Sequence, residues 1–257
     1  MRTLAFARVA LKVSLIQFRR YLFDTLSGLI VVFFAFLLIF FGARSLMAPG
    51  PDTGDTLSAI VVGFAIWFLA IMGYSATTQS VIEESMAGTL EQRALSPLGL
   101  VRVLVLDFAA SIVITATVVS TLLVLMMAVS GRWLHIDVVS LVPLGLLTLL
   151  GVFGIGLAAG GVAMVAKRLQ NFLQILQFVF VALIAAPLDR LPFVKYLPLA
   201  WGNHLISRVM IDEVSITDML PDVGFLVVNS LAWFALGVVV FRFFEDVARE
   251  RALLGHY

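Results

Sequence analysis

The sequence predicts an all-α, polytopic membrane protein. It is expected to have six transmembrane helices, an N-terminal amphipathic helix at the membrane surface, and short re-entrant helices before the last span. Two observations predict this fold class. Of the 257 residues, 61% are hydrophobic and only 13% are charged, whereas soluble domains carry about 25% charged residues. The few charges are also gathered into short islands between long uncharged runs.

Residues 1–23 predict the surface helix. Its basic residues are Arg2, Arg8, Lys12, Arg19 and Arg20. Apolar residues recur between them, which is typical of helices that lie in the lipid headgroup layer. The basic residues continue to Arg20 and no small-residue cleavage site follows the first apolar run, so we do not expect a cleaved signal peptide.

Six uncharged runs approach or exceed the length of about 20 helical residues that crosses the hydrocarbon core. They are residues 25–43, 56–82, 108–131, 138–166, 169–188 and 223–241. With six spans, both termini lie on one side, which then holds twelve of the 17 lysines and arginines. Basic residues collect in cytoplasmic loops. We therefore expect both termini in the cytoplasm and the chain in the cytoplasmic membrane.

The longest connection, residues 189–222, precedes the last span and is expected on the outer side. It holds three prolines and an apolar stretch, residues 197–211, that is too short to cross the membrane. This composition predicts one or two short helices that dip into the outer interface. In the fourth span, Gly156 and Gly160 form a G-x-x-x-G pair, which permits close helix contact.

A charged island at residues 83–97 separates the second and third runs. Glu84, Gly88 and Glu91 recur at helical spacing and Leu90 gives the segment an apolar side, so the island predicts a short amphipathic helix at the membrane surface. Pro97 ends it, because proline cannot supply the next backbone donor. A helix that only joins two spans would have the same composition.

The pattern E-x-x-x-G-T-L-E in this island, followed by Ser-Pro, resembles the cytoplasmic loop of ABC-2 type transporter permeases, the transmembrane subunits of ABC exporters. The resemblance implies one ABC-2 type transmembrane domain over residues 1–257, with this loop as a coupling helix that contacts an ATPase subunit. The coupling residues that it implies are Glu83, Glu84, Gly88, Thr89, Leu90, Glu91, Arg93, Ser96 and Pro97. It also implies two copies of the ATPase, which bind ATP and Mg²⁺, and a second permease subunit, identical or paralogous.

Polar side chains inside the spans are candidates for a substrate path. Gln170, Gln174 and Gln177 share one face of the fifth run, and amides in lipid need partners, so this stripe is expected to face protein or a water-filled cavity. The resemblance implies that the second and fifth spans line the path. The other candidates are Trp67, Tyr74, Thr78, Asn229 and Trp233. Helix–helix hydrogen bonding and core packing are the alternative interpretations.

The sequence offers no catalytic chemistry of its own. It lacks the phosphate-binding pattern G-x-x-x-x-G-K-[ST], so ATP hydrolysis is expected on a separate subunit. It has no cysteine and three scattered histidines, which predicts no metal site. We expect no enzyme activity, no cofactor in this chain and no nucleic-acid partner; membrane lipid surrounds the spans.

The apolar spans favour a hydrophobic or amphiphilic cargo, drug-like or lipid-like. A polysaccharide or glycolipid exporter is the alternative within the family. Outside it, the competing hypotheses are an ion-coupled secondary transporter that uses Asp24 or Asp107, and a membrane scaffold without transport. Internal repeats, which such transporters commonly show, are not evident in the sequence.

Overall fold

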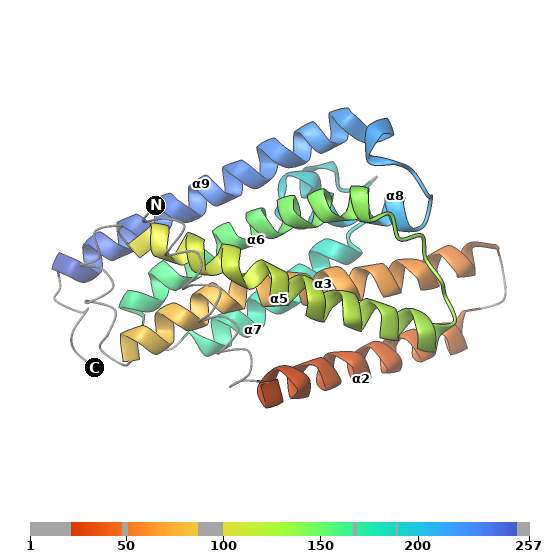
Figure 1. Ribbon diagram of the computed structural model, residues 1–257, viewed down its shortest axis with the longest axis horizontal. Helices are drawn as coiled ribbons and strands as arrows, with labels where there is room; N and C mark the ends of the chain where they lie inside the picture. The colour runs from red at the N-terminus through yellow and green to blue at the C-terminus, as the bar shows by residue number, and fades with distance from the viewer. Residues whose placement is uncertain (1–21, 48–50, 87–99, 167–168, 189, 251–257) are drawn as a thin grey trace.

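The computed structural model describes residues 22–47, 51–86, 100–166, 169–188 and 190–250, and within these residues it is helical and contains no strand (Figure 1). In chain order the elements are α2 (Leu22–Leu46), α3 (Pro51–Met86), α5 (Leu100–Ser130), α6 (Val138–Val165), α7 (Gln170–Ala185), η1 (Pro192–Tyr196), α8 (Ala200–Met210), η2 (Ile216–Met219) and α9 (Leu220–Glu250). The predicted surface helix, residues 1–23, lies outside the described residues, except that its last two residues begin α2.

Of the described helices, five are long and apolar enough to cross a membrane: α2, α3, α5, α6 and α9. They coincide with the first four and the last of the predicted runs. Their length and composition indicate a multi-pass, membrane-embedded protein. The fifth predicted run forms α7, which has 16 residues and spans about 24 Å at 1.5 Å per residue. It is shorter than the hydrocarbon core of about 30 Å.

Helix α6 occupies the centre of the bundle, between α9 and the pair α3 and α5 (Figure 1). Glycines make this position possible. A Cβ atom on Gly154 would lie 2.8 Å from the Phe234 Cα of α9, and one on Gly156 would lie 3.0 Å from the Tyr74 Cα of α3. The predicted Gly156 and Gly160 pair therefore faces α3, where Gly160 meets Val81, while Gly154 faces α9.

Helix α2 lies at the edge of the bundle and packs on α3 and α5. Phe36 and Phe40 are buried in this contact, and the Phe36 ring meets Phe64 of α3 edge-on, with ring centroids 5.6 Å apart. Most of the remaining surface of α2 is apolar and exposed; Leu38, for example, is 76% exposed. Such a surface is stable only in lipid or against another apolar surface.

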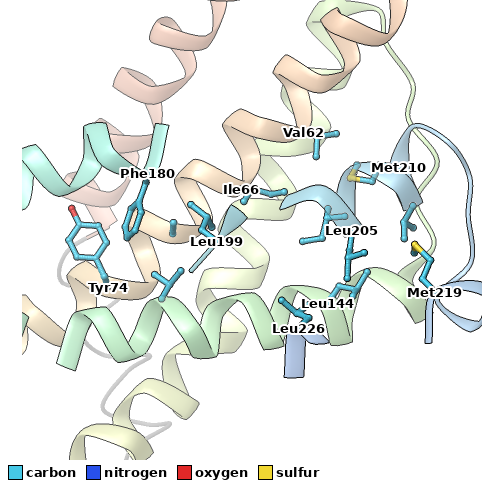
Figure 2. Close-up of a cluster of buried hydrophobic side chains, with 14 of the residues drawn as sticks. Val62, Ile66, Tyr74, Leu144, Phe180, Leu199, Leu205, Met210, Met219 and Leu226 are labelled. Atoms are coloured by element: carbon cyan, nitrogen blue, oxygen red, sulfur yellow. The ribbon is translucent and has the colours of Figure 1, made fainter. Parts of the chain in front are cut away.

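The described part of the chain between α7 and α9, residues 186–188 and 190–219, packs into the bundle. We call this segment the α7–α9 connection. Helix α8 buries Leu205 and Val209 against α3 and α6, and Figure 2 shows its residues Leu205 and Met210 in one cluster with Val62 of α3 and Leu144 of α6. Leu199, just before α8, lies beside Ile66 and Phe180 in the same cluster (Figure 2).

The start of α6 is capped by Asp137. Its side chain accepts a hydrogen bond from the Val139 amide at 3.1 Å, which satisfies one of the helix N-terminal donors, and a second hydrogen bond from the Ser140 hydroxyl. The hydrogen bond from the Ser140 hydroxyl, with smaller contributions from backbone amides and from His135, holds the pKa of the Asp137 carboxyl below its usual value. The cap is therefore charged at neutral pH.

Candidate functional site

The predicted coupling residues begin at the end of α3. Glu83 and Glu84 lie in its last turn, and the Ser80 hydroxyl donates to Glu84 Oε1 at 3.3 Å. The other predicted coupling residues, Gly88, Thr89, Leu90, Glu91, Arg93, Ser96 and Pro97, lie outside the described residues.

The electrostatics of this helix end favour a cationic neighbour. Helix α3 has no basic residue in its last turn, and the C-terminus of a helix carries a partial negative charge. An exposed carboxylate near the C-terminus of a helix is unfavourable by about 0.3–1 kcal/mol. Glu83 is exposed. Since α3 has 36 residues, or about 54 Å, it is longer than the thickness of a hydrocarbon core, about 30 Å.

Three predicted path residues come together between α3 and α7. The Trp67 indole N–H donates to the Gln177 carbonyl at 3.2 Å, and the Tyr74 hydroxyl donates to the Leu173 carbonyl at 3.3 Å. The Gln177 side chain lies within hydrogen-bonding reach of the Tyr74 hydroxyl. We call Trp67, Tyr74 and Gln177 the Tyr74 cluster. It is a polar contact inside an otherwise apolar part of the bundle.

The predicted glutamine stripe leads from this cluster to the surface of α7. Gln177 is half-buried beside Tyr74, Gln174 is exposed, and Gln170 is the first residue of the helix. The exposed residues next to Gln174 include Ile175 and Phe178. An amide surrounded by such residues in lipid has no hydrogen-bonding partner. This face of α7 is therefore suited to contact with protein or water.

Thr78 holds two helices together. It is fully buried, and its hydroxyl lies 3.1 Å from the Gly156 carbonyl of α6 and 2.9 Å from the Tyr74 carbonyl of its own helix. The structure thus places Thr78 in the α3–α6 contact, directly behind the Tyr74 cluster.

Thr78→Val is expected to lower the stability of the protein by about 0.5–1.5 kcal/mol, because the hydroxyl is lost while the shape is kept. The measurement is the midpoint of thermal unfolding in detergent. Thr117→Val is the matched control, since the Thr117 hydroxyl is exposed and bonds only to the Val113 carbonyl of its own helix. Equal midpoints for the two variants would contradict a structural role for Thr78.

Asn229 and Trp233 hold the α7–α9 connection. The Asn229 side-chain amide donates to the Lys195 carbonyl at 3.2 Å, and the Trp233 indole N–H donates to the Tyr196 carbonyl at 2.9 Å. Both acceptors belong to η1. The structure does not bring these two predicted path residues together with the Tyr74 cluster.

These contacts place η1 well along α9. Counted from Leu220 at 1.5 Å per residue, Asn229 and Trp233 lie about 14 and 20 Å from the start of the helix. Lys195, which belongs to η1, directs its Nζ atom over the rings of Tyr196 and Phe225, at 5.2 and 5.8 Å from their centroids. Phe225 lies nearer the start of α9 than Asn229 does. The ammonium group thus reaches back toward the start of α9.

Trp233→Phe is expected to loosen η1. Loss of one hydrogen bond of about 0.5–1.5 kcal/mol would raise the opening equilibrium roughly two- to tenfold. The chain has no cysteine, so a Val194→Cys substitution at the buried position of η1 gives a unique label site. Its rate of reaction with a maleimide should rise in Trp233→Phe and stay unchanged in the control Trp133→Phe, since Trp133 is 73% exposed. Equal rates in both would show that the bond does not hold η1.

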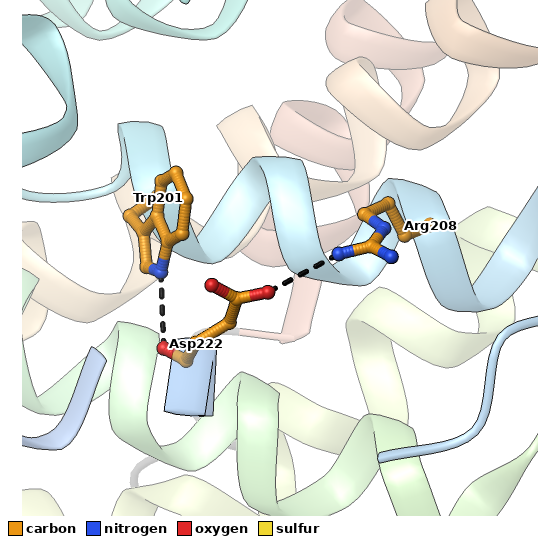
Figure 3. A network of polar contacts seen from close by, with 3 residues as sticks. All are labelled: Trp201, Arg208 and Asp222. Atoms are coloured by element: carbon orange, nitrogen blue, oxygen red, sulfur yellow. Dashed lines mark hydrogen bonds and ion pairs between the residues drawn. The ribbon is translucent and has the colours of Figure 1, made fainter. Parts of the chain in front are cut away.

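The sequence did not single out the polar contacts of α8. The Trp201 indole N–H donates to the Asp222 carbonyl at 3.1 Å, and Arg208 pairs with the Asp222 carboxylate at 3.2 Å (Figure 3). The Asn203 amide donates to the Ile184 carbonyl at 3.4 Å. The ion pair is about one-third exposed, so it contributes no more than about 1 kcal/mol. Together these contacts fix α8 to both α7 and α9.

No group of three or more histidine, cysteine, aspartate or glutamate side chains in the described ranges could hold a metal ion. The predicted site residues that the structure describes fall mainly into two groups: the acidic end of α3, and the Tyr74 cluster with the glutamine face of α7.

Comparison with models of known protein families, with curated proteins and with solved structures gives no match for this chain.

Proposed function

We propose that this chain is the transmembrane permease subunit of an ATP-driven exporter of the ABC-2 type, with a hydrophobic or amphiphilic cargo. The observation that carries the proposal is the E-x-x-x-G-T-L-E pattern, which starts at Glu84 in the last turn of α3. The acidic end of this helix favours a basic partner surface. The ATPase is a separate subunit, because the chain has no phosphate-binding loop.

Five described helices are long enough to cross a membrane, and the proposal adds one more crossing, the fifth in chain order, made of two parts. Helix α7 is too short to span alone, and the α7–α9 connection packs against α9 as far along as Trp233. We infer that α7 crosses part of the bilayer and that η1 and α8 are the re-entrant segments that complete it. Backbone that is not part of a long helix is tolerated in a membrane only where protein contacts satisfy its polar groups. The side chains of Asn229, Trp233 and Asn203 donate hydrogen bonds to such backbone carbonyls in and before the α7–α9 connection. Both termini then lie on the cytoplasmic side.

In this proposal the ATPases close on ATP and push on residues 83–97. That segment follows α3 in the chain, and Trp67 and Tyr74 of α3 donate hydrogen bonds to backbone carbonyls of α7. Rigid-body movement of α3 would therefore be passed to α7 through the Tyr74 cluster. A second permease subunit that faced the glutamine stripe would supply the partners that Gln174 requires in lipid.

The test is transport in vesicles that contain this chain and its ATPase. We expect ATP to change the fraction of a fluorescent phospholipid analogue that an external quencher can reach, and we expect no change in vesicles that lack either subunit. Transport by this chain alone, driven by a proton or sodium gradient, would contradict the proposal and would favour an ion-coupled transporter that uses Asp107.

A further inference from the structure

The two helices on either side of the charged island are buried together against α9. Val81 lies near the end of α3 and Leu100 is the first residue of α5. Both belong to one hydrophobic cluster with Phe241 and Ala248 of α9, and none of the four is more than 1% exposed. We call these four residues the base cluster. Figure 1 shows the end of α3, the start of α5 and the last turns of α9 at the same end of the bundle.

Helices α3 and α9 meet at Gly160 of α6. A Cβ atom on Gly160 would lie 3.3 Å from Val81 Cγ2 and 3.8 Å from Phe241 Cε2, and one on Gly161 would lie 2.9 Å from the Phe241 Cα. The three helices approach this closely because neither glycine has a side chain. The end of α3 is therefore in direct contact with the α6–α9 pair.

One face of α9 stays buried beyond the uncharged run that predicted this helix. The run ends at Phe241, but Glu245 and Ala248, four and seven residues later on the same helical face, are also buried. The Glu245 carboxylate is paired with Arg249, one turn further along. The last turns of α9 are thus part of the packed bundle, and they lie where the chain enters and leaves the island.

From these contacts we propose that movement of residues 83–97 is transmitted through the base cluster to α6 and α9. The proposed function is the premise, since the ATPase supplies that movement. Close-packed side chains have low compressibility and transmit strain, and the base cluster packs the helices on both sides of the segment against α9. This route is separate from the one that leads from α3 to α7 through the Tyr74 cluster.

Val81 and Leu100 are positioning residues in this scheme. They carry no charge or hydrogen bond that a partner could recognise, and their side chains are buried inside the bundle. Substitutions there should leave the binding of the ATPase intact and weaken the mechanical link behind it. Glu91, by contrast, is expected to act in the binding step.

The test uses vesicles that contain this chain and its ATPase, with the fluorescent phospholipid analogue as the probe, and the quantity measured is transport per ATP hydrolysed. Val81→Ala removes two carbon atoms from the contact at Gly160. We expect capture of the ATPase and ATP hydrolysis to persist and transport per ATP to fall several-fold. The control Val61→Ala makes the same deletion on α3 at an equally buried position, in the separate cluster that contains Phe36 of α2. It should lower the midpoint of thermal unfolding by a similar amount and leave transport per ATP unchanged.

Two results for the valine variants would overturn the proposal. Equal transport per ATP in Val81→Ala and Val61→Ala would mean that the base cluster only stabilises the fold. Loss of ATPase capture in folded Val81→Ala would mean that this residue acts in the binding step. If Val81→Ala does not fold, Leu100→Ala replaces it, with Leu122→Ala, an equally buried leucine of α5, as its control, and the same difference is expected.

Failure of the proposed function has a different signature. The unsubstituted chain would then capture no ATPase or transport no analogue, before any substitution is made, and this inference would fall with it. An unsubstituted pair that transports the analogue, with equal ratios in the two valine variants, would overturn only the role of the base cluster.

Discussion

Gly154→Val is expected to prevent this protein from folding into a stable bundle. A Cβ atom at Gly154 would collide with the carbonyl group of Trp233 and would lie 2.8 Å from the Phe234 Cα, both on α9. At Gly237, the facing residue of α9, a Cβ atom would collide with Gly154 in turn. Because the obstacles are backbone atoms, no side chain can rotate away, and the cost should reach or exceed the upper end of the 1–3 kcal/mol typical of overpacking, about 3 kcal/mol.

The matched control is Gly145→Val, which lies on the same helix. A Cβ atom at Gly145 meets nothing within 4 Å, so the two variants share the change in helix propensity and differ in the collision. The measurement is the yield of monodisperse protein in detergent, followed by the midpoint of thermal unfolding. We expect a near-complete loss of yield for Gly154→Val and near-native yield for Gly145→Val. Similar values for both would contradict the close α6–α9 contact.

Glu91→Lys is expected to abolish capture of the ATPase by this chain. If the proposed function is right, we expect Glu91 and Glu84 to pair with basic residues of the ATPase and Leu90 to fill an apolar notch on it. Reversal of one charge replaces an attraction with a repulsion, and like charges across an interface cost several kcal/mol. The measurement is the amount of ATPase that remains bound to the tagged chain after purification.

The control for this charge reversal is Glu250→Lys. Glu250 is exposed at the end of α9, on the side of the membrane that the proposal assigns to the cytoplasm, and it is not part of the predicted coupling helix. We expect it to leave ATPase capture unchanged. Undiminished capture by Glu91→Lys would show that the contact lies elsewhere.

The positions of most helices could be predicted from the uncharged runs between charged residues, but the residues at which the helices begin and end could not. The run from residue 108 was expected to begin after Asp107, yet α5 begins at Leu100 and includes Arg102 and Asp107. A charged residue ends the hydrocarbon-facing part of a helix, while its backbone can continue into the interface. At the end of α7 the sequence does mark the boundary: Ala186 is extended, as residues before a proline tend to be.

The sequence could identify the polar residues of the candidate site, but it could not identify their hydrogen-bonding partners. Helical periodicity places Gln170, Gln174 and Gln177 on one face, but it does not reveal that Gln177 lies beside Tyr74. Asn229 and Trp233 could be chosen as polar residues within a span, yet their acceptors are carbonyls 34 and 37 residues away along the chain. Backbone acceptors have no signature in the sequence, so these contacts become visible only in the structure.

Co-expression of the full chain with the ATPase encoded nearest to it, followed by purification through a tag on this chain, tests the permease assignment most directly. The proposal predicts stable co-purification in mild detergent, with ATP hydrolysis that depends on the presence of both subunits. Failure to recover an ATPase under several mild conditions would contradict it. Asp107 of α5 would then be the first residue to test for ion-coupled transport.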